Sequence, residues 1–227
     1  METRELRATS AGERRDRDRE LVRLIGRHGV MRLKQVMRAM EVGRTATYRR
    51  FQRCEAAGLV ERLMIPGVGP VLHATRDGIR YAGLGLPVAA ISPGGVDHML
   101  RCATVAISAG RQYGHERVLT EREIAFAEAI EERPIASAKI GSVHGHPRYH
   151  RADIAILRDK GTIAVEVELT PKAPQRLRAI IAAWCRASWI AEVHYLCAPG
   201  QTRRAVERAV AKVGAGDKIA IFKVVPR

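Results

Sequence analysis

The sequence predicts a mixed α/β chain built in two parts. Across residues 17–57 the apolar side chains recur at helical spacing, and from residue 59 the pattern changes to two short strands around a turn of glycine and proline. Beyond residue 97, predicted helices alternate with apolar strands, which is typical of a mixed central sheet flanked by helices. The 227 residues are enough for one large or two small domains, and 46% apolar residues exclude disorder throughout.

The first part is predicted to contain helices followed by a hairpin. Residues 1–16 are charged and short of apolar groups, which indicates a flexible charged arm or a frayed helix start. Gly58 is expected to end the third helix because glycine adopts the left-handed conformation at little cost. The predicted elements are helices at 17–28, 33–40 and 44–57, strands at 59–65 and 71–74, and a fourth helix at 75–84 capped by Thr75.

This order of elements resembles the winged helix-turn-helix family over residues 17–86. The most specific part is the segment from Val42 to Val60, whose ending Glu-Ala-Ala-Gly-Leu-Val is similar to the end of a recognition helix and the first wing strand. The resemblance implies that the third helix enters the major groove of double-stranded DNA. If Thr47, Phe51 and Cys54 face the core, the outward side chains predicted to contact DNA are Arg44, Thr45, Tyr48, Arg49, Gln52 and Arg53, with Arg62 from the hairpin.

These side chains suit different contacts with DNA. Arginine pairs bidentately with guanine and glutamine with adenine, whereas Arg53 and Arg62 are better placed for phosphates. The alternative is a winged helix used for protein contact, whose exposed face would usually be neutral or acidic. The wing tip, residues 67–69, has no Lys or Arg, so we expect it to contribute backbone N–H groups or no contact.

Residues 87–96 hold two prolines and two glycines and are predicted to be a linker before a second domain, residues 97–227. Residues 126–150 are expected to be irregular and contain His144, His146 and His150. These histidines are interpreted as part of a solvated basic loop, with metal ligation as the alternative. The predicted elements are helices at 97–113, 175–188 and 202–213 and strands at 117–124, 153–157, 162–169, 193–197 and 218–225.

Carboxylates interrupt the apolar strand pair of the second domain. Glu166 and Glu168 lie two residues apart, so they share one face of a strand, and Asp153 on the neighbouring strand is placed to join them. Here the chain resembles the PD-(D/E)xK nuclease-like superfamily, which implies a restriction-endonuclease-like domain. The resemblance assigns the catalytic positions to Asp153 and Glu166, with Glu168 in place of the usual lysine and Lys172 as a substitute ammonium.

Two readings of these carboxylates stay open. In an active nuclease, Asp153 and Glu166 would hold Mg²⁺, which activates water against a phosphodiester. In the alternative, the domain is degenerate and non-catalytic, and Glu166 and Glu168 form ion pairs with Arg151, Arg176 or Arg178 that only stabilise the fold. DNA binding itself requires no cofactor.

The order of the motifs is similar to the replication-relaxation family of plasmid and other mobile-element proteins. It runs from Thr75-Arg76-Asp77-Gly78 through Asp97-His98 and the segment 118–123 to His150-Arg151-Ala152-Asp153 and the segment 165–169. The resemblance implies DNA binding in replication, transfer or transcriptional regulation of a plasmid, phage or other mobile element. Implied partners are double-stranded DNA, a second copy in a homodimer, and replication or transfer proteins.

Composition agrees with a polyanionic partner. The chain has 39 Lys plus Arg against 24 Asp plus Glu, a formal net charge of +15. Residues 1–90 carry 18 basic and 10 acidic residues, and residues 91–227 carry 21 and 14, so the excess is +8 and +7. A GC-rich genome also inflates arginine, so the placement of the charge is more informative than its size. Without a signal-peptide pattern or a membrane span, and with four scattered cysteines, we expect a cytoplasmic protein associated with the bacterial nucleoid or a plasmid.

The sequence therefore predicts a sequence-specific DNA-binding protein with a non-catalytic nuclease-like domain. The alternatives are a Mg²⁺-dependent DNA endonuclease and a protein-interaction adaptor.

Overall fold

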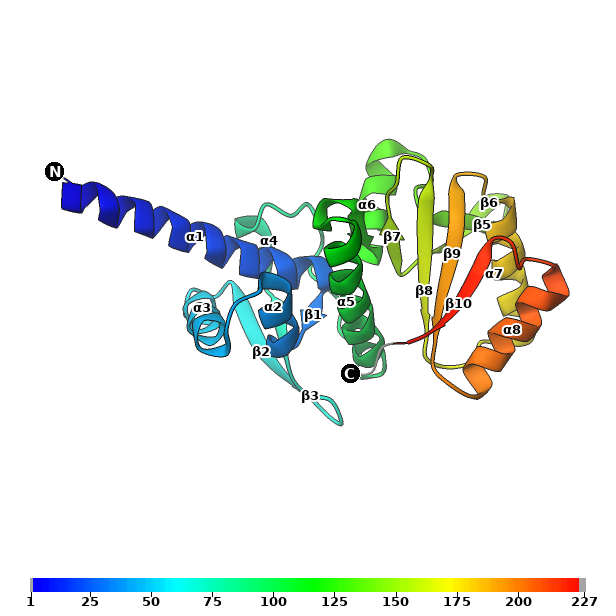
Figure 1. Ribbon diagram of the computed structural model, residues 1–227, viewed down its shortest axis with the longest axis horizontal. Coiled ribbons are helices and arrows are strands. Elements are labelled where there is room, and N and C mark those ends of the chain that lie inside the picture. The colour runs from blue at the N-terminus through cyan, green and yellow to red at the C-terminus, as the bar shows by residue number, and fades with distance from the viewer. Residues whose placement is uncertain (1, 225–227) are drawn as a thin grey trace. The chain divides into compact units, whose positions relative to one another are not determined.

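A computed structural model describes residues 2–224, with side chains from residue 12 onward, and divides the chain into two compact units (Figure 1). The first unit comprises residues 1–103 and the second comprises residues 104–227. The division falls inside helix α5, Pro93–Tyr113. Within residues 2–224, no helix has both the length and the apolar character needed to cross a membrane.

The first unit packs helices against a small antiparallel sheet of order β1-β3-β2. Its elements are α1 Glu2–His28, β1 Val30–Met31, α2 Leu33–Met40, α3 Arg44–Ala56, β2 Val60–Ile65, β3 Gly69–Ala74 and α4 Arg76–Tyr81. Fully buried side chains from α1 and α3, among them Leu21, Ile25 and Phe51, make its core. The helix-helix-turn-helix-hairpin order predicted for this part is present.

Gly58 makes the change from α3 to the hairpin possible, and Thr75 and Gly78 make the change from the hairpin to α4 possible. Gly58 follows α3 at φ +68°, a left-handed conformation in which the Leu59 N–H donates to Cys54 O (2.9 Å). Thr75 caps α4, because its Oγ1 accepts from the Gly78 N–H (3.1 Å). A Cβ at Gly78 would lie 1.9 Å from Leu59 O, so only glycine allows α4 to pack this closely on the start of the hairpin.

The first part differs from the prediction at three places. Residues 2–16, predicted as a flexible charged arm or a frayed helix start, are the first half of α1, so the helix alternative is the one present. The short strand β1 has only two residues and no periodicity to reveal it. The predicted linker, residues 87–96, ends in the first turn of α5, where Val96 is buried with Val30 and Val71.

The second unit is built on a five-stranded mixed sheet of order β10-β9-β8-β7-β4 (Figure 1). The strands β8, β9 and β10 are parallel, whereas β7 is antiparallel to both of its neighbours. The helices α7 and α8 are the crossovers between the parallel strands, and both cover the same face of the sheet. The bounds are β4 Val118–Thr120, β7 Ile154–Ile156, β8 Thr162–Glu168, α7 Pro174–Arg186, β9 Ile190–Cys197, α8 Gln201–Val213 and β10 Ile219–Lys223.

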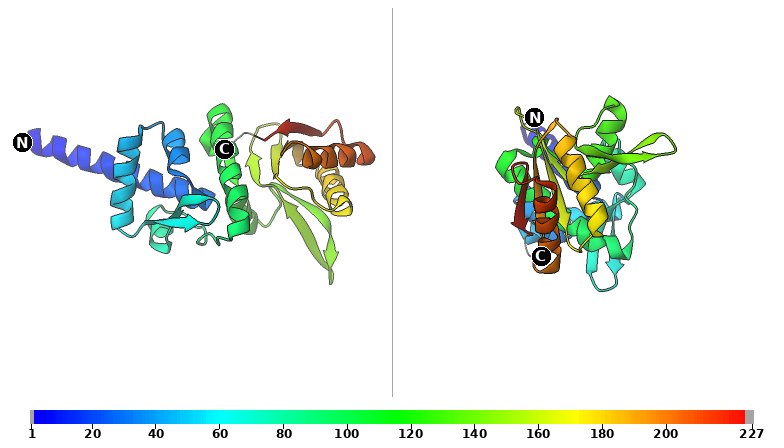
Figure 2. Two further views of the ribbon diagram at one scale, coloured as in Figure 1. Left: turned by 90° about the horizontal axis from the view of Figure 1, so that it is seen from below. Right: turned by 90° about the vertical axis from the view of Figure 1, so that its right-hand side faces the viewer.

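Residues 115–151 differ most from the prediction. A short 3-10 helix, His115–Arg117, precedes β4, and the predicted strand ends after three residues because Thr120 and Glu123 form a capping box that begins α6, Glu121–Glu131. The segment predicted as irregular contains a hairpin, β5 Ser137–Val143 and β6 His146–Arg151, which projects from the body of this unit (Figure 2). Both turn residues, His144 (φ 49°) and Gly145 (φ 81°), have positive φ, as two-residue hairpin turns require.

Candidate functional site

The face of α3 opposite the core carries the side chains predicted to contact DNA. Thr47, Phe51 and Cys54 are buried, as their spacing predicts. Because these three positions fix the rotation of the helix, most of the residues between them point outward, whereas Arg50 is half-buried. The exposed residues of α3 are Arg44, Thr45, Ala46, Tyr48, Arg49, Gln52, Arg53 and Ala56, and none of them is acidic. The predicted exposure of this set is confirmed, whereas contact with DNA stays a prediction.

The hairpin adds a cation to this face. The guanidinium of Arg62, on β2, lies over the ring of Phe51 (5.0 Å to the centroid) and near the ring of Tyr48 (5.9 Å). A guanidinium stacked on aromatic rings keeps its in-plane N–H groups free to point along the surface. The fold therefore brings Arg62 beside Tyr48, as a shared contact surface requires.

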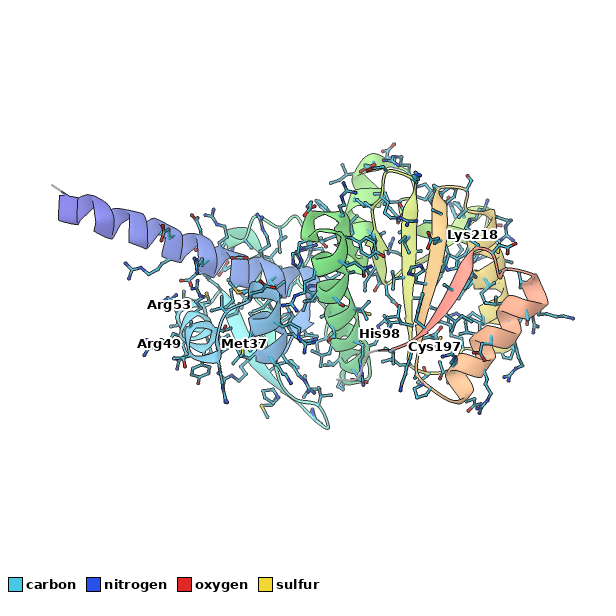
Figure 3. The ribbon with its side chains drawn as sticks, in the orientation of Figure 1. Met37, Arg49, Arg53, His98, Cys197 and Lys218 are labelled. Carbon is cyan, nitrogen blue, oxygen red and sulfur yellow. The ribbon has the colours of Figure 1, made fainter. Side chains whose placement is uncertain are left out.

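Arg53 has a partner on α1. Its Nε donates to Asp18 Oδ2 (3.1 Å) and its Nη2 donates to Asp18 Oδ1 (2.7 Å), and the hydrogen bond with Asp18 raises the pKa of Arg53. The pair ties α3 to α1 and offsets a charge that was predicted to serve phosphates. Arg49, one turn earlier, lies with Arg53 on the outer side of α3 (Figure 3).

The β2–β3 hairpin has a basic neighbour that the sequence did not reveal. Arg32, directly before α2, donates from Nη2 to Val68 O in the β2–β3 turn (3.0 Å). Its guanidinium therefore reaches the tip of the hairpin, residues 67–69, which itself has no Lys or Arg. A contact between residues 36 positions apart leaves no periodic signal along the chain, so only the fold shows it.

The carboxylates predicted in the second unit lie inside it. Glu166 and Glu168 are 3% and 5% exposed, and β8 pairs them with Tyr195 and Cys197 of β9. The Nε2 atom of His150 donates to Glu166 Oε1 (2.8 Å). The interpretation of His150 as part of a solvated basic loop is therefore wrong, because β6 places it against β8.

The other predicted residues also have partners within the protein. Lys172 forms an ion pair with Glu168, four residues earlier. The Oδ2 atom of Asp153 accepts the backbone N–H of Val167 (2.7 Å). The structure thus brings the predicted acids and Lys172 into one region of β7 and β8.

Glu166 and Glu168 form ion pairs, as one of the two interpretations predicted, but their partners are not the predicted arginines. Arg151 pairs with Glu128 (3.3 Å), while Glu166 and Glu168 pair with His150 and Lys172. His150 and Lys172 were not predicted as the ion-pair partners of the glutamates. His150 lies in a segment predicted as irregular, and Lys172 lies outside any predicted element.

The environment shifts the proton affinities in this region. Burial opposes the charged form of His150, but the hydrogen bond and the charge of Glu166 prevail and raise the pKa of His150. Burial also raises the pKa of Glu166, and the hydrogen bond from His150 only partly offsets this effect. Burial and the nearby carboxylates of Glu166 and Glu168 raise the pKa of Tyr195 well above its usual value, so its hydroxyl stays protonated.

The three acids do not form one three-ligand cluster. Mg²⁺ takes oxygen ligands in octahedral geometry and keeps several waters. Among residues 2–224, Asp153, Glu166 and Glu168 do not bring one oxygen each to within 4.8 Å of one another. The imidazole of His150 and the ammonium of Lys172 contact the carboxylates of Glu166 and Glu168. Metal ligation by Asp153 and Glu166 stays a prediction.

Comparison of the chain with protein-family models, with curated proteins and with solved structures finds no match.

Proposed function

We propose that this chain is a sequence-specific double-stranded DNA-binding protein whose first unit is a winged helix-turn-helix. The observation that carries the proposal is the exposed face of α3, which presents arginines, Thr45, Tyr48 and Gln52 and has no acidic residue. A helix used for protein contact has no general need for a face that is both cationic and free of acids. A helix in the major groove needs both properties, because phosphates flank the bases it contacts.

The roles on this face follow from side-chain chemistry. Arg49 and Gln52 have the fork geometries that match guanine and adenine edges, so they are proposed to read the sequence. Arg44, at the start of α3, lies where a recognition helix enters the groove. Thr45 and Tyr48 serve phosphates or a thymine methyl, and Arg62, stacked beside Tyr48, serves phosphates.

For the second unit we propose a nuclease-like, non-catalytic role in DNA affinity, dimerisation or partner docking. The buried pairs His150–Glu166 and Lys172–Glu168 support this, because a hydrolytic site must expose its acids to water and substrate. The proposed setting is replication, transfer or transcriptional regulation of a mobile element in the bacterial cytoplasm, with a homodimer or replication and transfer proteins as partners.

Selection from a randomised duplex library tests the DNA-binding proposal directly. We expect an enriched sequence motif and an affinity that falls steeply between about 50 and 200 mM salt. The absence of any salt-dependent affinity for DNA would contradict the proposal and favour a protein-interaction adaptor.

Incubation of supercoiled and linear DNA with the protein and Mg²⁺ or Mn²⁺ tests the role of the second unit. We expect both DNA forms to remain intact. Cleavage that is lost in Asp153→Ala would replace the non-catalytic role by that of a metal-dependent endonuclease.

A further inference from the structure

A second basic feature lies beside α3, in a hollow between α1 and α3 of about 390 Å³. Its lining residues are Glu13, Arg14 and Arg17 of α1 and Arg50 of α3. The hollow holds roughly a dozen water volumes, so a hydrated anion fits. Three guanidinium groups and one carboxylate line it.

Arg50 is the unusual member of this group. Its Nε and Nη1 atoms are buried and have no hydrogen-bond partner among the described residues. Burying a guanidinium without an acceptor is unfavourable, and native proteins usually provide one. Two nitrogen atoms of this guanidinium are therefore left without an acceptor among the described residues, at the edge of the hollow.

The neighbouring contact shows that α1 is able to supply an acceptor. One turn further along α3, Arg53 binds both carboxylate oxygens of Asp18 on α1. Around Arg50, α1 presents Arg14 and Arg17 together with one carboxylate, Glu13, and all three are exposed. More positive charge beside an unpartnered arginine destabilises the free protein unless an anion binds there.

We propose that this hollow binds a backbone phosphate of the DNA duplex that lies on α3. The inference rests on the proposed function, because the duplex delivers the anion. Guanidinium groups suit phosphate oxygens, since their planar N–H donors form short, charge-assisted hydrogen bonds. α1 then acts together with α3, with Arg50 and Arg17 fixing the position of the duplex and Arg49 reading bases.

Salt titrations of Arg50→Gln in the full chain, with a random-sequence duplex, test the site. We expect affinity to fall about tenfold, as for the loss of one charge-assisted hydrogen bond. The slope of log affinity against log salt is expected to fall by about one, as for one lost phosphate contact. Stability to denaturant is expected to hold or rise, because the replaced group has no partner in the free protein.

Arg19→Gln is the matched control on the same helix. The guanidinium of Arg19 lies over the ring of Tyr81 (5.4 Å), on the side of α1 that packs against α4. This variant removes the same charge from α1 but not from the hollow, so we expect affinity and slope near the wild-type values. If Arg50→Gln unfolds, Arg17→Gln, at an exposed position, tests the same hollow without disturbing buried atoms.

Two results would overturn the site, and they are distinguishable. If Arg50→Gln and Arg17→Gln bind as Arg19→Gln does while Arg49→Ala weakens binding, the phosphate site is wrong and the proposed function stands. If the wild-type protein has no salt-dependent affinity for the duplex, both inferences fail together.

Discussion

The exposed arginines of α3, Arg44, Arg49 and Arg53, lie at the surface of the first unit, whereas the two glutamates of β8 lie inside the second. Arg53, the exposed arginine of α3 with an ion-pair partner, keeps 49% of its side chain exposed in that pair. Glu166, by contrast, is 3% exposed and bonded to a histidine. An exposed group is available to a ligand. An enclosed and paired group instead stabilises the fold, and its proton affinity differs between the folded and the unfolded chain.

Burial decides how an acidic or basic motif in a sequence is interpreted. Both regions show charged residues at regular spacing, and the sequence predicts a role on DNA for each of them. Only the burial of each group separates a surface built for a partner from a cluster that is satisfied internally.

The largest effect is expected for His150→Ala. The substitution leaves Glu166 buried without its partner, so we expect a loss of about 3–5 kcal/mol in the free energy of unfolding. Urea denaturation measures it, with His146→Ala on the exposed part of the same hairpin as the control. Equal, small effects of both substitutions would show that the pair is not enclosed in solution.

The same pair predicts how stability depends on pH. The pKa values of His150 and Glu166 are both raised in the folded state, so the folded chain binds more protons than the unfolded chain. The pair is therefore most favourable at low pH, and its contribution is lost as pH rises through the raised values. Unfolding free energies between about pH 5 and pH 9 measure this.

The control for the pH profile is the double variant His150→Gln/Glu166→Gln, which keeps similar shapes without titrating. We expect its profile to be flatter than that of the wild type over this range. A wild-type profile that rises more steeply with pH than that of the double variant would contradict the assigned direction.

For the exposed face of α3 we expect a substitution to change DNA binding and to leave stability nearly unchanged. Arg49→Ala is expected to weaken specific DNA binding by about 1–3 kcal/mol while leaving the unfolding free energy nearly unchanged. Gel-shift titration and urea denaturation measure the two quantities. Arg76→Ala, an exposed arginine of α4, is the control, and unchanged binding in Arg49→Ala would count against this rotation of α3.

The smallest effect is expected for Asp18→Asn. This variant removes the charge that pairs with Arg53, and exposed ion pairs contribute only about 0.2–1 kcal/mol, less at high salt. Urea denaturation at low and high salt measures it, with Asp16→Asn, an exposed acid one half-turn earlier, as the control. A loss as large as that of His150→Ala would remove the contrast between the two regions.

Local patterns predicted the elements whose signals are local. The spacing of Thr47, Phe51 and Cys54 specified which face of α3 is exposed, because buried positions on a helix determine its rotation. The alternation along β8 likewise placed Glu166 and Glu168 on one face of a strand. The start of α6 was missed because the capping box of Thr120 and Glu123 follows a strand pattern without a break.

The partners of the charged groups were not predictable in the same way. His150 reaches Glu166 across 16 residues, and Arg53 reaches Asp18 across 35. Such pairs depend on the packing of β6 on β8 and of α1 on α3, which no periodicity in the chain encodes.

The sequence by itself determined the order of the elements, the exposed face of α3 and the shared face of the β8 glutamates, because these depend on backbone periods of 3.6 and 2 residues. The packing of distant segments decided that Glu166 is enclosed against His150, that Asp18 pairs with Arg53, and that the Nε and Nη1 atoms of Arg50 have no hydrogen-bond partner among the described residues. The physical reason is that the burial and pairing of a charge depend on side chains from distant segments, whose approach only the packed chain defines.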